Sequence, residues 1–136
     1  MRTYNLFISH SWAHSDAYDR LVNLLKARPY FRYSNYSVPK DDPLHTSGTD
    51  KELYAAIKGK MAPCSVVLIL AGIYASYSKW IDKEIQIAQT EFLNSKPILA
   101  IEPWGSERTS VKVKEAADKI VGWNTESIVS AIRELA

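Results

Sequence analysis

The feature that most constrains this chain is a continuous apolar run near its middle, residues 65–71 (SVVLILA). The run is short for a helix, rich in β-branched residues and free of any apolar–polar alternation. A strand of this kind is buried on both faces, which happens where helices cover both sides of a parallel sheet. The run therefore favours an α/β fold built on a parallel sheet.

Strand-like and helix-like segments alternate along the rest of the chain. Short apolar or β-branched segments predict strands at residues 4–8, 36–38, 65–71, 97–101 and 120–122. Apolar residues recur with helical spacing between them, in residues 17–26, 53–61, 81–92 and 125–135. The alternation predicts five βα units.

Such units form a doubly wound, flavodoxin-like parallel sheet, most simply in the strand order 2-1-3-4-5. We expect a single domain over residues 1–136. In this topology ligands bind outside the carboxyl ends of the strands, near strands 1 and 3. The most polar and the most Pro-rich and Gly-rich segments of the chain are predicted to lie at that edge.

Composition excludes several classes of protein. The 17 basic and 15 acidic residues are scattered and give a net charge of +2, so a general nucleic-acid binder is not expected. No segment has the length and apolarity of a signal peptide or a membrane span, which indicates a cytoplasmic protein without membrane attachment. Cys64 stands alone before an apolar run and is expected to be a buried core residue, and no metal-ligand spacing is present.

Two chemistries that this topology often carries are also absent. A phosphorylatable receiver needs acidic residues after strand 1 and an Asp at the end of strand 3, but Ser9-His10 and Ala71-Gly72 stand there. A P-loop or dinucleotide-binding turn needs clustered glycines, and the five glycines of this chain are scattered. Phosphoacceptor and P-loop chemistry are therefore not expected.

The third helix carries the most informative acidic residue. If Ser78 caps this helix, Trp80 and Glu84 are an i, i+4 pair, and Glu84 lies about 60° of rotation from the core residue Ile81. One interpretation is a solvated carboxylate near the positive end of a helix. The other is a carboxylate partly enclosed by Trp80 and the strand 1 loop, suited to holding ribose hydroxyls and stabilising an oxocarbenium ion. Spacing alone leaves both open.

Several motifs resemble the TIR superfamily. They are the segment Phe7-Ile8-Ser9-His10-Ser11, the Pro-containing loop after strand 2, and a W-x-x-x-E helix, Trp80-Ile81-Asp82-Lys83-Glu84. The stretches 102–108 (EPWGSER), 117–124 (ADKIVGWN) and 127–129 (SIV) are similar to the TIR-like family that includes the Thoeris anti-phage TIR proteins. The resemblance runs from residue 4 to residue 135 in the expected order.

This resemblance implies an immune sensor whose substrate is NAD⁺ and which uses no cofactor. Members of the Thoeris group cleave the nicotinamide–ribose bond and cyclise ADP-ribose into a diffusible signal that activates a separate effector. By matching position, Glu84 is the catalytic carboxylate and Trp80 shapes its pocket. Phe7, Ser9 and His10 are expected to lie against the nicotinamide ribose.

The loop after strand 2 corresponds to the one that TIR domains use for self-association and for gating the site. It contains Asp41, Asp42, Pro43 and His45, of which Asp42 and His45 are candidate substrate-binding residues. The resemblance therefore implies association through TIR surfaces, in addition to binding of NAD⁺.

The expected chemistry suits one carboxylate. Nicotinamide leaves as a neutral molecule from a cationic precursor, so the main demand is to stabilise positive charge on the ribose. Cyclisation also requires that water be excluded while an adenosine-ribose hydroxyl attacks. Two alternatives remain open, a non-catalytic adaptor acting through TIR-to-TIR contact and a receiver-like interaction module. Both would leave NAD⁺ intact.

Overall fold

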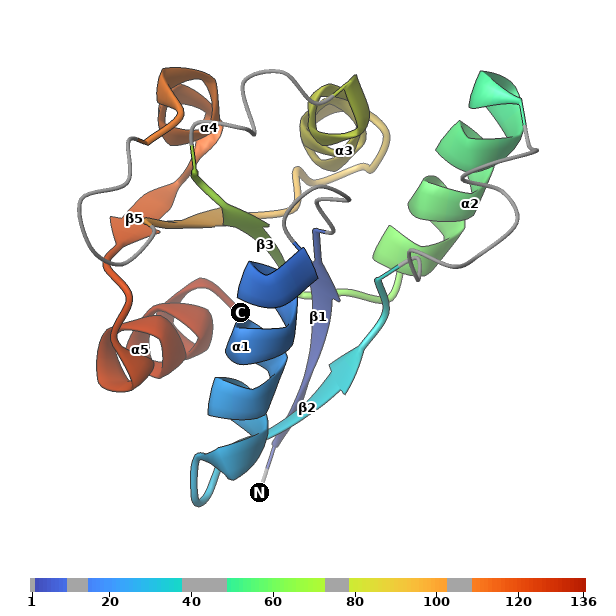
Figure 1. Cartoon of the computed structure of the whole chain (residues 1–136). Helices are drawn as coiled ribbons and strands as arrows, with labels where there is room; N and C mark the ends of the chain where they lie inside the picture. Colours follow the sequence, from blue (N-terminus) through green and yellow to red (C-terminus); the bar gives the residue numbers. More distant parts are fainter. Residues whose placement is uncertain (1, 10–14, 38–48, 73–78, 103–108) are drawn as a thin grey trace.

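The computed structural model describes residues 2–9, 15–37, 49–72, 79–102 and 109–136. These residues form a five-stranded parallel sheet in the order β2-β1-β3-β4-β5 (Figure 1). The strands are β1 (Thr3–Ile8), β2 (Arg32–Asn35), β3 (Val66–Leu70), β4 (Ile98–Ile101) and β5 (Lys119–Val121). The helices are α1 (Ser15–Ala27), α2 (Asp50–Met61), α3 (Lys79–Thr90), α4 (Val111–Ala116) and α5 (Thr125–Leu135). The predicted flavodoxin-like fold and strand order are confirmed.

Helices cover both faces of the sheet. α1 and α5 pack on one face, while α2, α3 and α4 pack on the other (Figure 1). Successive side chains of a strand point to opposite faces, so Val67 and Ile69 of β3 join the core with α2–α4 and Leu68 joins the core with α1 and α5. Every residue of β3 is buried. The uninterrupted apolar run thus reflects a central strand covered on both faces.

The second strand lies earlier in the chain than the prediction of residues 36–38, which was wrong. β2 comprises Arg32–Asn35, pairs with β1 alone and has exposed residues at both ends. The pairing continues as the Tyr36 amide donates to the Leu6 carbonyl at 2.9 Å. An edge strand needs no apolar run because only part of it is covered, so its polar sequence gave no strand signal.

Two helices also differ from expectation. α3 ends at Thr90, so Phe92 lies beyond the helix on which it was expected, although it still packs against the core. α4 was not placed by periodicity, because its six residues are too few to show a repeat. Its amino end is defined instead by Ser110, whose hydroxyl accepts a hydrogen bond from the Val113 amide at 3.4 Å. The expected cap of α3, Ser78, lies outside the described residues.

The expectation for Cys64 is confirmed. Its side chain is buried, and Sγ donates to the Lys60 carbonyl at 3.3 Å. Burial raises the pKa of this thiol to about 12, an effect that the nearby Lys96 ammonium opposes. A thiol held neutral in this way is a poor nucleophile.

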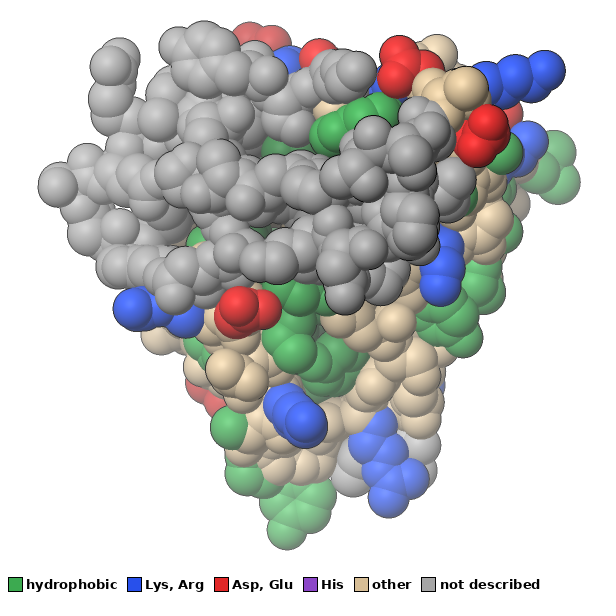
Figure 2. Space-filling view, turned by 45° about the vertical axis from the view of Figure 1, so that its right-hand side comes forward, with side chains coloured by type: hydrophobic (Ala, Val, Ile, Leu, Met, Phe, Trp, Pro, Cys, Tyr) green, Lys and Arg blue, Asp and Glu red, His purple; other side chains and the backbone are tan. Residues whose placement is uncertain are grey.

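The surface of the described residues shows no concentration of one charge on the face drawn in Figure 2, where acidic and basic side chains are interspersed with apolar ones. Among the described helices, none is both long and apolar enough to cross a membrane.

Candidate functional site

The strand that opens the chain places a serine at the carboxyl edge of the sheet. Leu6 and Ile8 of β1 face α1 and α5, whereas Phe7 is buried on the α3 side of the sheet. Ser9 follows Ile8, so by the same alternation its side chain points to the α3 side, as that of Phe7 does. Its backbone is fixed there because the Ser9 amide donates to the Leu68 carbonyl of β3 at 2.9 Å. The Ser9 side chain is only 3% exposed.

α3 brings a carboxyl group to the same place. The helix is anchored on the sheet by Ile81 and Ala88, both buried in the α2–α4 core, and Trp80 packs against that core from its first turn. Glu84 follows Ile81 by three residues and Trp80 by four, which puts it on the inward face of the helix. It is 5% exposed. The solvated interpretation of Glu84 is therefore wrong, and the carboxyl group is buried. The strand 1 loop that was expected to help enclose it lies, beyond Ser9, outside the described residues.

The buried carboxyl group is poorly satisfied. Within the part of the chain that the structure describes, neither Oγ of Ser9 nor Oε2 of Glu84 has a hydrogen-bond partner of ordinary geometry. Burial raises the pKa of Glu84 to about 8, and the nearby Ser9 hydroxyl lowers it in part. At neutral pH the carboxyl group is consequently mostly protonated. Buried polar atoms without partners, together with a strongly raised pKa, mark a candidate ligand site.

Backbone contacts hold the neighbouring end of the sheet together. The Ser110 amide donates to the Ala71 carbonyl at 2.7 Å, and Gly72 and Thr109 form an isolated antiparallel bridge. These contacts tie the start of α4 to the end of β3. α4 is in turn joined to α3 by an ion pair between Lys112 Nζ and Asp82 Oδ1 at 2.9 Å. The amino end of α3 is therefore linked through α4 to the end of β3.

The structure brings four of the predicted site residues together in one part of the fold. Ser9 and Glu84 are buried, Phe7 lies in the core two residues before Ser9, and Trp80 is half-buried one turn before Glu84. His10, Asp42 and His45 lie outside the described residues.

Sequence reasoning missed two residues at this edge. Lys83 contacts the Trp80 ring, and the fully buried Ser110 caps α4. Lys83 had no signal of its own in the sequence, since a helix lysine is ordinary. Ser110 had a weak one, because a serine before a short segment is a possible N-cap.

Across the ranges that the structure describes, no group of three or more His, Cys, Asp and Glu side chains is positioned to bind a metal ion.

These features define a class of protein, a flavodoxin-like α/β fold with a buried glutamate on the helix that follows the third strand. The family model of the TIR-like domain of Thoeris protein ThsB matches residues 7–108 of the chain. The match covers well over half of the 136 residues and includes Ser9, Trp80 and Glu84. The chain belongs to this family and is a TIR-type protein of Thoeris defence. No curated protein is significantly similar to it.

Proposed function

We propose that this protein cleaves NAD⁺ at the nicotinamide–ribose bond and cyclises the ADP-ribose into a signalling molecule that activates a separate effector in anti-phage defence. The observation that carries the proposal is Glu84, a buried carboxyl group with an unpartnered oxygen at the carboxyl edge of the sheet. Membership of the Thoeris TIR-like family supports it.

The first chemical step breaks the bond between C1′ of the ribose and the nicotinamide nitrogen. The electron pair of that bond goes to nicotinamide, which leaves neutral, and positive charge develops on the ribose. An ionised Glu84 stabilises this charge, and its effect is large because the surroundings exclude water. Nicotinamide needs no proton in order to leave, so one carboxylate suffices.

In the second step a hydroxyl group of the adenosine ribose attacks C1′ and loses its proton, which Glu84 can accept as a general base. If water attacks instead, the product is linear ADP-ribose. The outcome depends on how well the site excludes water and positions the hydroxyl group.

The proton on the resting carboxyl group is compatible with this chemistry. At neutral pH Glu84 is mostly neutral, because burial raises its pKa to about 8. The nicotinamide ring of NAD⁺ carries a positive charge, and a cation beside a carboxyl group favours the ionised form. Binding of the substrate thus promotes the charge state that the reaction needs.

The test compares the wild type with Glu84→Gln, which is nearly isosteric and cannot ionise. Small molecules are extracted from phage-infected cells that carry either form and are analysed by mass spectrometry. We expect NAD⁺ loss and a cyclic ADP-ribose product with the wild type and neither with Glu84→Gln. Wild-type consumption of NAD⁺ by the variant would refute the assignment of Glu84. Intact NAD⁺ with both forms, at every protein concentration, would favour the non-catalytic adaptor.

A further inference from the structure

Lys83 lies next to Glu84 in sequence but faces a different neighbour. Its ammonium group is 6.0 Å from the centroid of the Trp80 ring, within the range of a cation–π contact. The side chain is half-buried. Among the described residues no carboxylate forms an ion pair with it. Lys83 is therefore a positioned cation whose charge is not neutralised by these residues.

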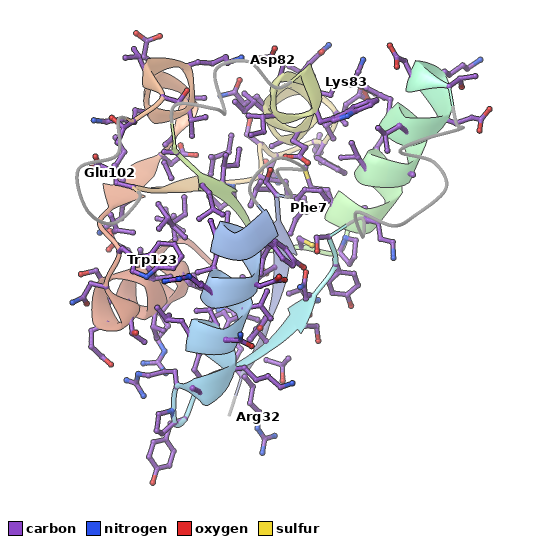
Figure 3. All side chains as sticks on the ribbon, in the orientation of Figure 1. Phe7, Arg32, Asp82, Lys83, Glu102 and Trp123 are labelled. Atoms are coloured by element: carbon purple, nitrogen blue, oxygen red, sulfur yellow. The ribbon has the colours of Figure 1, made fainter. Side chains whose placement is uncertain are left out.

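The acidic residue that directly precedes Lys83 does not compensate this charge. Asp82 pairs with Lys112 of α4 at 2.9 Å. Figure 3 shows Asp82 on the α4 side of α3 and Lys83 on the side toward α2. The negative charge of Asp82 is therefore paired on the α4 side of α3, whereas the positive charge of Lys83 lies on the side toward α2.

Helical geometry places Trp80 between Lys83 and Glu84. Successive residues of a helix are about 100° apart, so Glu84 is rotated about 40° from Trp80 in one direction and Lys83 about 60° in the other. A molecule lying across the indole ring would meet the carboxyl group on one side and the ammonium group on the other. Two buried oxygens, Oγ of Ser9 and Oε2 of Glu84, have no hydrogen-bond partner among the described residues and could accept polar contacts from such a molecule.

The ammonium group does not suit the reacting part of the substrate. Cleavage of a nicotinamide–ribose bond develops positive charge on the ribose, and a second cation close to that charge would raise the barrier. Lys83 suits the other part of a dinucleotide, the two linked phosphates, each of which carries a negative charge. The carboxyl and ammonium groups then serve opposite ends of one ligand.

We propose that Lys83, held over the Trp80 ring, binds the phosphate groups of the dinucleotide substrate while Glu84 faces its nicotinamide ribose. This inference rests on the proposed function and adds a residue that determines substrate class. It requires a substrate in which phosphate follows the ribose, and it separates binding, assigned to Lys83, from cleavage, assigned to Glu84.

The first experiment compares three compounds that share the same glycosidic bond. NAD⁺ has two phosphates, nicotinamide mononucleotide has one, and nicotinamide riboside has none. Lys83→Gln should raise the KM for NAD⁺ about 10-fold or more, because hydrogen bonds to charged groups are the strong ones, with kcat near the wild-type value. The effect should shrink for the mononucleotide and vanish for the riboside.

Two further variants serve as controls. Lys83→Arg keeps a positive charge and should stay within about 3-fold of the wild-type KM, because either cation can pair with phosphate. Lys60→Gln removes an exposed charge at the far end of α2 and should change nothing. The inference is wrong if Lys83→Gln behaves like Lys60→Gln, if the three compounds are affected equally, or if kcat falls while KM is unchanged.

A second measurement separates this inference from the proposed function. Binding of ADP-ribose, which keeps both phosphates, is measured by calorimetry with the wild type and Lys83→Gln at low and high salt. Weaker binding by Lys83→Gln, with the difference reduced at high salt, supports the role of Lys83 even if NAD⁺ is never cleaved. Cleavage of NAD⁺ with the same KM and the same ADP-ribose affinity in both forms overturns the role of Lys83 alone.

Discussion

The Ser9 hydroxyl group partly lowers the pKa of the Glu84 carboxyl group, which burial has raised to about 8. Ser9 directly follows β1 and Glu84 lies on α3, so the interaction joins the carboxyl end of a strand to the helix that covers it. A carboxyl group held in this state is neutral at rest and has to ionise before it can stabilise a cation. The pH dependence of activity should therefore report directly on this pair.

The rate of NAD⁺ cleavage should rise with pH. The proposed mechanism requires an ionised Glu84 in the free protein, so kcat/KM should increase about 10-fold per pH unit below the pKa of Glu84 and level off near pH 8. The corresponding rise of kcat, which reports on the substrate complex, should occur at lower pH, because the bound nicotinamide cation favours ionisation of Glu84. Initial rates between pH 5 and pH 9 provide the measurement. A flat profile would contradict a role for an ionised Glu84.

Replacing Ser9 by Ala should move the rise of kcat/KM with pH to higher pH. The hydroxyl group is the contact that lowers the pKa of Glu84, and its removal leaves the desolvation effect less opposed. The pKa is measured independently of activity by ¹³C NMR titration of labelled Glu carboxyl groups, with Glu84→Gln used to assign the signal. Ser130→Ala, which removes an exposed hydroxyl group on α5, is the matched control. An unchanged titration of Glu84 in Ser9→Ala would show that the hydroxyl group does not act on the carboxyl group.

Glu84 should also make folding stability depend on pH. Burial raises the pKa of Glu84 from 4.5 to about 8 in the folded state, so folding favours the neutral carboxyl group. Below about pH 4.5 this group is neutral in both the folded and the unfolded protein. As the pH rises toward 8 it ionises in the unfolded protein first, and the free energy of unfolding decreases. Relative to the wild type, Glu84→Gln should gain stability across this window, by on the order of 4 kcal/mol at its upper end. Urea unfolding at pH 5, 6, 7 and 8 measures the difference between the two forms. A constant difference would mean that Glu84 is not buried in the neutral form.

The sequence predicted the sheet well because its strongest signals came from burial. The apolar run of β3 marks a strand covered on both faces, and the alternating helices fix the strand order. The polar edge strand β2 and the six-residue α4 gave no such signal, since neither buries a periodic face. The W-x-x-x-E spacing located Glu84 on the correct helix. It could not show that the carboxyl group is buried, because that depends on where β1 ends against α3.

Contacts such as that between Lys83 and Trp80 are harder still to predict. They depend on side-chain conformation within one helix, and a pattern of residue types does not specify it. The same holds for the ion pair between Asp82 and Lys112 of α4, because these residues are thirty positions apart in the sequence. Sequence thus identified the residue expected to carry the chemistry and left the electrostatics around it to the structure.

Core residues on the two faces of β3 should affect the site differently. Ile69 and Leu68 are both buried, but Ile69 packs in the cluster that holds Ile81 of α3, whereas Leu68 packs toward α1 and α5. Replacing either by Ala should cost about 2–5 kcal/mol in the free energy of unfolding, measured with urea. Only Ile69→Ala loosens the support of α3, which admits water to Glu84 and lowers its pKa from about 8 toward its ordinary value. The ¹³C titration of Glu84 should therefore shift to lower pH in Ile69→Ala and stay in place in Leu68→Ala. Equal shifts in both variants would mean that the pKa follows overall stability rather than the packing of α3 on the sheet.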